Sequence, residues 1–291
     1  MRLATWNVNS LKVRLPHVLD WLATADCDVL CLQETKLTED KFPAAELQAA
    51  GYGVAFSGQK TYNGVAILSR LPMRDVSCGM PDFADEQKRV IAATIAVAAG
   101  SAAAPAAAAN ARLVASPAAE ATGAAGTTGG AATVRVVCAY IPNGQSLESD
   151  KYRYKLDWLD GLQGYMAAQT VVHTHTALLG DYNIAPEDRD VHDPAAWQGQ
   201  VLVSAAERAH FQKLLDAGFT DCFRLFEQPE KLFSWWDYRM LGFRRNAGMR
   251  IDHILASPAL AATCRACVID KAPRKREQPS DHTPVVADFS L

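Results

Sequence analysis

The stretch ALLGDYNIAPED, from Ala177 to Asp188, shows a pattern that recurs along the whole chain. Three apolar residues, 177–179, indicate a buried strand, and the polar residues Asp181 and Asn183 follow almost at once. Residues two apart in an extended chain point to the same face. We therefore predict that the carboxylate of Asp181 and the amide of Asn183 face one common object at the end of this strand.

Strand-like and helix-like segments alternate on either side of this stretch. KRVIAATIAV at 88–97 and TVRVVCAYIP at 133–142 are rich in β-branched residues and predict strands. LPHVLDWLATA at 15–25 and KYRYKLDWLDGL at 151–162 have the spacing of amphipathic helices. Alternating elements of both kinds predict an α/β or α+β fold with central sheets.

The composition is that of an ordinary globular protein. Of 291 residues, 49% are hydrophobic and 21% are charged. There is no uninterrupted apolar run of about 18 residues, so we expect no membrane span and no membrane partner. The N-terminus has no apolar segment of a signal peptide, and the seven cysteines are scattered through apolar segments. This cysteine usage is typical of a cytoplasmic protein, and we expect a monomer.

One segment, at about 98–133, differs in composition from the rest. It consists mostly of Ala, Gly, Ser and Thr, with Leu113 and Val114 as its larger apolar residues. Such a segment cannot bury enough apolar surface to offset the entropy lost on ordering. We predict one domain over 1–291 that carries a flexible Ala/Gly-rich insertion here. A partly helical excursion, limited in length by Pro105 and Pro117, is the alternative.

Five further segments resemble the opening stretch, because polar residues stand at the end of a predicted strand, just before one, or, for Asp252 in RIDHIL, inside one. They are TWNVNS, LCLQETK, CAYIPNG, RIDHIL and QPSDHTPVV. Taken alone, each is most often a turn or a cap. Functional residues often gather on loops at one edge of a sheet, so six such segments together predict one site. The site residues are Asn7, Glu34, Tyr140, Asn143, Asp181, Asn183, Asp252, Asp281 and His282.

The predicted site is rich in hard oxygen ligands. Glu34 and Asp281, with the amide of Asn7, suit Mg²⁺ or Mn²⁺. There is no HExxH motif and no Cys/His pairing that would favour zinc. Carboxylates, an amide, a tyrosine and a histidine around such a metal fit the hydrolysis of a phosphate ester. In that chemistry the metal offsets charge on the phosphoryl oxygens, and a base activates water.

The charge distribution leaves room for a nucleic-acid partner. A net charge of −3 argues against a protein that coats nucleic acid by bulk charge, but not against a local basic track. Two basic clusters are candidates for such a track, although each alone is most often a solvated loop. They comprise Arg239, Arg244, Arg245 and Arg250, and Lys271, Arg274, Lys275 and Arg276.

Seven segments, in order along the chain, closely resemble the exonuclease III family of apurinic/apyrimidinic endonucleases, within the endonuclease/exonuclease/phosphatase superfamily. They are TWNVNSLKVR, LQETK, AYIPNG, GDYNIAPED, FSWWDYR, RIDHIL and SDHTPV, and the match extends from Arg2 to Asp288. The resemblance implies a four-layer α/β sandwich of two packed β-sheets flanked by helices. It also implies a Mg²⁺-dependent DNA repair nuclease that acts on duplex DNA at abasic sites and from 3′ ends.

The resemblance implies a metal role for Glu34, as principal ligand, with Asn7 and Asp281 completing the site. Asn9 stands where some relatives have Asp, so we assign it no metal role. Asp181 would activate the attacking water.

Other residues would act on the water and the phosphate. Asn183 would hold the water or the transition-state oxygen, and Tyr140 and Asn143 would orient the phosphate. Asp252 and His282 would form a hydrogen-bonded pair, which leaves open whether Asp181 or His282 is the base.

The resemblance implies that the segment FSWWDYRMLGFRRNAGMRID forms a loop that enters the DNA. By position, Trp235, Met249 and Ile251 would wall the pocket for an abasic sugar, with one of the tandem tryptophans in the core. Lys36 and Arg89 match basic positions near the site in the family, and the two basic clusters would then contact phosphates.

Two alternative functions remain at this stage. One is a superfamily phosphatase or phosphodiesterase that acts on a phosphate ester other than DNA, such as an inositol phosphate, which FSWWDYR argues against. The other is a catalytically silent relative that only binds nucleic acid, which the complete set of acids argues against. The balance between abasic-site incision, 3′–5′ exonuclease and 3′-phosphatase activity, and the number of metals, stay open.

Overall fold

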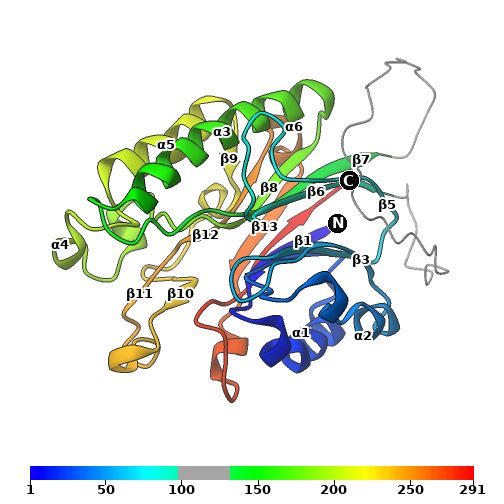
Figure 1. The fold of residues 1–291 in the computed structure, drawn as a ribbon, viewed down its shortest axis with the longest axis horizontal. Helices are drawn as coiled ribbons and strands as arrows, with labels where there is room; N and C mark the ends of the chain where they lie inside the picture. Colours follow the sequence, from blue (N-terminus) through cyan, green and yellow to red (C-terminus); the bar gives the residue numbers. More distant parts are fainter. Residues whose placement is uncertain (98–131) are drawn as a thin grey trace.

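Two six-stranded β-sheets form the centre of the molecule, in a computed structural model that describes residues 1–97 and 132–291 (Figure 1). The first sheet has the strand order β13-β14-β1-β2-β4-β3. β1 and β2 run parallel, and the other neighbours run antiparallel. In sheet order the strands are Cys264–Ile269, Val285–Phe289, Arg2–Asn7, Val29–Gln33, Val65–Ser69 and Gly53–Ser57.

The second sheet has the strand order β5-β6-β7-β8-β12-β9, with β7 and β8 parallel and the other neighbours antiparallel. In sheet order its strands are Met73–Cys78, Val90–Ala96, Thr133–Tyr140, Thr176–Asp181, Asp252–Ala256 and Thr220–Asp221. A separate pair of short antiparallel strands, β10 and β11, lies beyond one end of the sheets (Figure 1). They span Trp235–Trp236 and Gly248–Met249.

The two sheets pack face to face because their central strands are apolar on both faces. In β2, Val29 and Cys31 point into the core between the sheets, and Leu30 and Leu32 point to the outer, helical side. Side chains alternate between the faces of a strand, so a strand that is buried on both faces needs a continuous apolar run.

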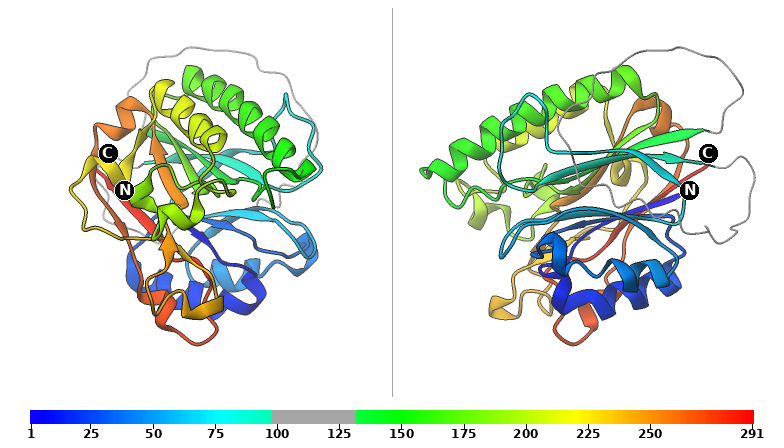
Figure 2. Two further views of the ribbon diagram at one scale, coloured as in Figure 1. Left: turned by 90° about the vertical axis from the view of Figure 1, so that its left-hand side faces the viewer. Right: turned by 45° about the vertical axis from the view of Figure 1, so that its right-hand side comes forward.

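Helices cover the outer face of each sheet (Figure 2). α1 (Leu11–Ala25) and α2 (Ala44–Ala49) pack on the first sheet, and α3 (Asp150–Val172) and α5 (Ala205–Asp216) pack on the second. This arrangement confirms the predicted four-layer α/β sandwich. The short helices α4 and α6 and the 3₁₀ turns η1 to η5 span Pro194–Trp197, Pro258–Ala261, Glu39–Lys41, Asp188–Asp190, Cys222–Leu225, Arg239–Leu241 and Ala272–Lys275.

The two ends of the predicted insertion lie next to each other. Ala96 pairs with Thr133 in the β6–β7 ladder, and the N–H of Val97 donates to the carbonyl oxygen of Ala132 at 2.7 Å. Thr133, where the predicted insertion and the predicted strand 133–142 overlap, belongs to β7. The predicted insertion otherwise falls on 98–131, outside the described residues. Within the described ranges, no helix is long and apolar enough to cross a membrane.

Candidate active site

The strand registers bring most of the predicted site residues to one end of the sandwich. Asn7 ends β1, and Glu34 follows directly after the parallel neighbour β2. In the second sheet, Asp181 at the end of β8 lies opposite Tyr140 of β7 on one side and opposite Asp252 of β12 on the other. Two strands of the first sheet and three of the second therefore deliver polar side chains to the same region.

Asn7 joins the two sheets through its side chain. Its Nδ2 donates to Oε1 of Glu34 at 2.8 Å and to Oδ2 of Asp181 at 2.9 Å. Its Oδ1 accepts the backbone N–H of Asn9 at 2.9 Å. One buried amide thus holds a carboxylate from each sheet in place.

Three residues form a buried series at the centre of the site. Nδ1 of His282 lies 2.9 Å from Oδ2 of Asp252 and 3.1 Å from its Oδ1. Nε2 of His282 lies 3.7 Å from Oδ2 of Asp181, which is longer than a hydrogen bond. Asp252 therefore orients the imidazole, whose other nitrogen faces Asp181. The predicted Asp252–His282 contact is present in the structure.

The three buried groups change each other's protonation. Burial alone would lower the pKa of His282, but the carboxylates of Asp252 and Asp181 outweigh it and raise this pKa to about 10. Burial raises the pKa of Asp181 to about 7, and the neighbouring Asp252 acts in the same direction, whereas His282 opposes it. At neutral pH the imidazole is therefore charged, and the Asp181 carboxyl lies near its own titration point.

Glu34 begins a chain of polar contacts that ends at Asp281. Nζ of Lys36 lies 2.9 Å from Oε2 of Glu34 and donates to Oδ1 of Asn9 at 2.5 Å. Nδ2 of Asn9 donates to Oδ1 of Asp281 at 2.9 Å, and the indole N–H of Trp235 donates to its Oδ2 at 3.1 Å. Burial alone would raise the pKa of Glu34, but contacts led by the Lys36 ammonium outweigh it and lower this pKa. Glu34 is therefore ionised.

The residues predicted to orient the phosphate lie on the same rim. Burial, together with nearby carboxylates, raises the pKa of the Tyr140 phenol well above its usual value, so the phenol is a proton donor. Nη1 of Arg89 donates to the carbonyl oxygen of Tyr140 at 3.1 Å. Nδ2 of Asn143 donates to Oδ1 of Asn183 at 3.0 Å, and the N–H of Asn183 donates to Oδ1 of Asp181 at 2.9 Å.

Residues 4–282 match the model of the endonuclease/exonuclease/phosphatase family. The chain belongs to this family. It is 32% identical over 299 residues to exodeoxyribonuclease III of Haemophilus influenzae, a match that covers 99% of the chain and 100% of that relative.

Two solved structures of this family are close in sequence and in shape. The 3′ phosphatase NExo from Neisseria, bound to a product DNA hairpin, is 42% identical with a TM-score of 0.85. An AP endonuclease from Archaeoglobus fulgidus is 36% identical with a TM-score of 0.84, and both matches cover 100% of each chain. These relatives confirm the predicted exonuclease III family and the predicted enzyme class, a hydrolytic nuclease of DNA repair.

Divalent metals serve the enzymes of this family, and the site offers two candidate ligand sets. The predicted set is Glu34 and Asp281 with Asn7. The side-chain amide of Asn7 is oriented with its Nδ2 toward Glu34. Among the described His, Cys, Asp and Glu residues, one group brings three ligand atoms within 4.8 Å of one another, and it consists of Asp181, Asp252 and His282. Both sets are rich in carboxylate oxygens, which suits a hard cation.

Trp235, which contacts Asp281 of the candidate active site, borders a cavity of about 380 Å³. His192, Trp197 and Arg245 also border it. The other two predicted wall residues, Met249 and Ile251, pack in the same apolar cluster as Trp235 but are buried. Trp236, the second of the tandem tryptophans, is fully buried, so one of the two belongs to the core as predicted.

The structure corrects the expectation that both basic clusters contact phosphates. Arg250 is only 1% exposed and is paired with Asp190 and Asp221. Arg274 is buried beneath aromatic rings, with its guanidinium carbon 4.9 Å from the ring centroid of Phe243. These two arginines were mistaken for surface residues because the sequence shows their charge and not the partners that bury them.

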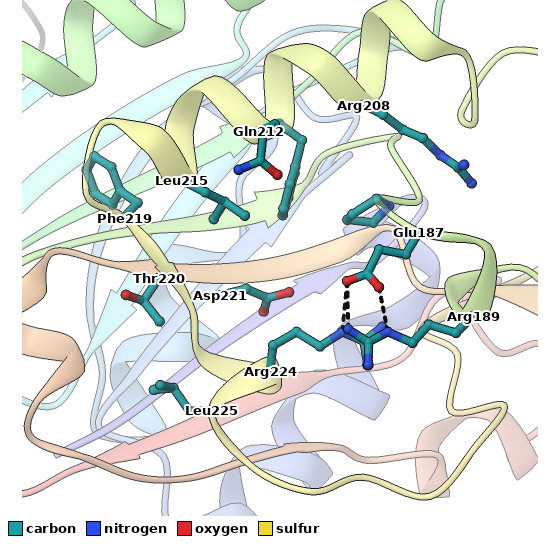
Figure 3. A pocket seen from close by; sticks show the side chains of 12 residues that line it. Glu187, Arg189, Arg208, Gln212, Leu215, Phe219, Thr220, Asp221, Arg224 and Leu225 are labelled. Atoms are coloured by element: carbon teal, nitrogen blue, oxygen red, sulfur yellow. Dashed lines mark hydrogen bonds and ion pairs between the residues drawn. The ribbon is translucent and has the colours of Figure 1, made fainter.

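A second cavity, of about 360 Å³, lies between α5, β9 and the two turns η2 and η3 (Figure 3). None of the predicted site residues lines it. Its arginines are already paired, since Glu187 contacts Arg189 and Arg224, and Arg208 binds Asp188. The cavity therefore offers no free charge to a ligand.

Two contributors to the site were not predicted from the sequence. Oγ of Ser234 accepts the backbone N–H of Asp252 at 3.0 Å and so fixes the start of β12. Lys155 of α3 is wholly buried and donates to the carbonyl oxygen of Asn183 at 2.7 Å. A signal for Lys155 exists in the sequence, because it falls at helical spacing between the apolar residues Tyr152 and Leu159.

Proposed function

We propose that this chain hydrolyses phosphodiester bonds of duplex DNA at abasic sites and at 3′ ends, with Mg²⁺ or Mn²⁺ as its metal. The observation that carries the proposal is the buried series Asp252–His282–Asp181, which Asn7 links to the ionised Glu34. The names of the relatives, an exodeoxyribonuclease, a 3′ phosphatase and an AP endonuclease, support this reaction and this substrate.

Asp181 is the proposed base. Its two oxygens already accept hydrogen bonds from Asn7 and from the N–H of Asn183, which fix the plane of the carboxylate. A carboxyl whose pKa lies near 7 can take a proton from an attacking water at neutral pH. Asn183 lies beside Asp181, and in this proposal its amide holds the same water.

His282 has a different proposed role. Its ring is fixed by Asp252 through Nδ1, and its Nε2 lies 3.7 Å from Asp181, too far for a hydrogen bond, so this N–H is not committed to that carboxylate. An imidazolium held between two carboxylates is a poor proton acceptor and a good hydrogen-bond donor. We propose that it donates to a non-bridging phosphate oxygen, while Tyr140 donates to another and Asn143 orients the phosphate.

Glu34, Asn7 and Asp281 would hold the metal in this proposal. We prefer this set to Asp181, Asp252 and His282, because the Nδ1 of His282 is already bound to Asp252. When bound, a divalent cation offsets negative charge that develops on the phosphoryl oxygens. Lys36, which contacts Glu34, keeps that carboxylate in place beside the phosphate.

The proposed DNA contacts lie on two neighbouring loops. The loop between β10 and β11 and the segment around η5 project on the same side of the molecule (Figures 1 and 2). The first loop exposes Met240 and Leu241 together with Arg239. An apolar tip flanked by arginine is suited to a distorted duplex, with Trp235 and the cavity beside it receiving the sugar.

One gel experiment tests the proposal. Three labelled duplexes, with an internal abasic site, a blunt end or a 3′-phosphate, are incubated with the purified chain and Mg²⁺, Mn²⁺ or EDTA. We expect incision at the abasic site and shortening from the blunt 3′ end with either metal, and neither with EDTA. Binding of the duplexes without any cleavage would identify a silent relative. Activity on the 3′-phosphate alone would overturn the proposed abasic and exonuclease substrates.

We also propose a monomer that forms a single domain and works in the cytoplasm, as the sequence analysis predicts. Light scattering during gel filtration of the full chain tests the first point. A mass of about 32 kDa, close to the 31.5 kDa of one chain, is the expected result.

A further inference from the structure

A buried ion pair lies behind the candidate active site. Nζ of Lys155, on α3, lies 2.5 Å from Oε1 of Glu207, on α5, and both side chains are 0% exposed. Lysine and glutamate are almost never fully buried unless they are paired. Burial lowers the pKa of Lys155, and Glu207 opposes this change. The pair belongs to the outer helical layer and not to the strand ends that carry the site.

The ammonium of Lys155 also reaches the two loops that deliver site residues. It donates to the carbonyl oxygen of Asn183 at 2.7 Å and to that of Asn143 at 3.3 Å. An ammonium has three N–H donors, and here all three are directed at defined acceptors. One donor is anchored on the helix layer through Glu207, and two hold the loops that follow β7 and β8.

Asn183 is the residue on which this contact has the most effect. Its φ is +49°, in the left-handed region, where an asparagine is tolerated but where surrounding contacts must hold the backbone. Its side chain bonds Asn143 and the carbonyl oxygen of Ile141, and its N–H bonds Asp181. Holding the carbonyl oxygen of Asn183 therefore holds the amide and the carboxylate that face the substrate.

Glu207 is itself fixed by the start of α5. Its Oε1 also accepts the N–H of Leu202 at 3.0 Å, and its Oε2 accepts the N–H and the hydroxyl of Ser204 at 3.0 and 2.6 Å. Ser204 Oγ in turn lies 2.5 Å from the hydroxyl of Tyr152, one turn before Lys155 on α3. The pair is thus anchored to two helices, which gives the loops a rigid support.

We propose that Lys155 is a positioning residue for hydrolysis, which holds Asn183 and Asn143 in their active orientation from a support formed by Glu207. The inference rests on the proposed function, because it assigns Lys155 an effect through residues that act on the water and the phosphate. Lys155 touches neither the substrate nor the reacting atoms.

The first test separates positioning from stability. Lys155→Met leaves the buried Glu207 without its cationic partner, whereas Lys155→Met with Glu207→Gln removes both charges and keeps an acceptor for Leu202 or Ser204. We measure three quantities: Tm, the Kd for whichever of the three labelled duplexes wild type cleaves fastest, and the single-turnover rate on that duplex at saturating enzyme. We expect the double variant to recover most of the Tm lost by Lys155→Met. Its rate should stay at least about tenfold below wild type, since an error of about 1 Å in placement can cost about 10²-fold.

The Kd of both variants should stay within about threefold of wild type, because Lys155 does not contact DNA. A rate that recovers together with Tm would show that the pair is structural only, and would overturn the proposal. The proposal would also be overturned by a variant that loses affinity and keeps its rate.

A double-mutant cycle tests whether Lys155 acts through Asn183. In wild type, Lys155→Met should slow cleavage at least about tenfold, but in an Asn183→Ala background the same change should slow it by less than about threefold. Full additivity of the two effects would exclude Asn183 as the route.

Arg135 offers a matched control at the opposite end of β7. Like Lys155, it is a buried cation that donates to a backbone carbonyl oxygen, in this case that of Asp75, and it also donates to the side chain of Gln169. Its contacts among the described residues do not include the loops near the site. Arg135→Met should lower Tm but keep the single-turnover rate within about threefold of wild type. If wild type itself cleaves none of the duplexes, the proposed function fails. If wild type cleaves and Lys155→Met matches it, only the positioning role fails.

Discussion

Two adjacent residues of β12, Asp252 and His253, belong to two different buried clusters of aspartate and histidine. Asp252 binds His282, whose other nitrogen faces Asp181. His253, which points to the other face of the sheet, accepts a hydrogen bond at Nδ1 from Arg250 and donates from Nε2 to the carbonyl oxygen of Ile184. The clusters contain similar residues and differ in the charge that faces the histidine.

That difference sets the protonation of each histidine. Burial and the Arg250 guanidinium lower the pKa of His253 to about 4, so it is neutral at pH 7. The two carboxylates around His282 raise its pKa to about 10, so it is charged at pH 7. The same residue type is thus a fixed structural acceptor in one cluster and a cationic donor in the other.

The clusters also differ in how completely their hydrogen bonds are formed. Arg250 binds Asp190 through two nitrogens, at 2.7 and 3.1 Å, and reaches Asp221 at 2.7 Å. In the other cluster, the contact of 3.7 Å between His282 and Asp181 is too long for a hydrogen bond. We infer that the first cluster stabilises the fold and that the second keeps groups available to a substrate.

The sharpest test of this contrast is Asp181→Asn. Loss of the base should slow single-turnover cleavage by about 10²–10⁴-fold. The affinity for DNA should be unchanged or higher, because a negative charge beside the phosphate is removed while Glu34 and Asp281 remain. Filter binding and single-turnover cleavage on one abasic duplex, at one stated salt concentration, measure both.

Two results would contradict this assignment of Asp181. Cleavage within about threefold of wild type would make His282 the candidate base. A joint loss of cleavage and affinity would instead make Asp181 a metal ligand first. Tm is measured alongside, because a change restricted to the site should leave the fold intact.

In the cluster around Arg250 and His253, Arg250→Met should lower stability and leave the cleavage rate nearly unchanged. This change leaves Asp221 buried without its partner and removes one of the two arginines that bind Asp190. Removal of one member of a buried ion pair costs about 3–5 kcal/mol of unfolding free energy. Urea unfolding should show this loss, while the cleavage rate per folded molecule stays within about threefold of wild type.

Arg153 provides the control for Arg250, because its pair with Asp150 on α3 is exposed. Arg153→Met should change the unfolding free energy by less than about 1 kcal/mol. If Arg250→Met removes activity in the folded protein as strongly as Asp181→Asn does, the two clusters are not separate in function.

Much of the fold could be predicted from the sequence, because its central strands are apolar on both faces. The run 29–32 and the run 90–95 show this pattern directly. The edge strand β5 could not be predicted, since most of its side chains are exposed and its register is interrupted near Asp75. The two-residue strands β9, β10 and β11 exist through tertiary pairing, which no local pattern encodes.

The site was predictable to a similar extent. Asp181 and Glu34 stand out because each stands where a buried strand ends, while their roles were implied by resemblance to a family. Lys155 was missed because a lysine on a helix is usually solvated, and its partner Glu207 lies 52 residues further along the chain. Arg250 was misplaced for the same reason.

The smallest expected effect concerns pH and tests the neutral state of His253. Its folded pKa, about 4, lies below the ordinary histidine value of 6.5, so the unfolded chain binds more protons between these values. The stability that His253 contributes is therefore fully present above about pH 6.5 and is lost as the pH falls toward 4. Between pH 7 and 5 the loss should be about 2 kcal/mol, from the difference between the two pKa values.

The variant His253→Gln isolates this term from every other acid-sensitive group. A glutamine can accept from Arg250 and donate to the carbonyl oxygen of Ile184, as the neutral imidazole does, but it does not titrate. Urea unfolding of both proteins at pH 7, 6 and 5 should show a stability loss in the variant that is smaller by about 2 kcal/mol over this range. The other acid-sensitive groups are the same in both proteins, so their contribution cancels in the difference. Equal losses in the two proteins would mean that His253 accepts a proton beside Arg250 without cost, and that the two histidines do not differ in the way their surroundings indicate.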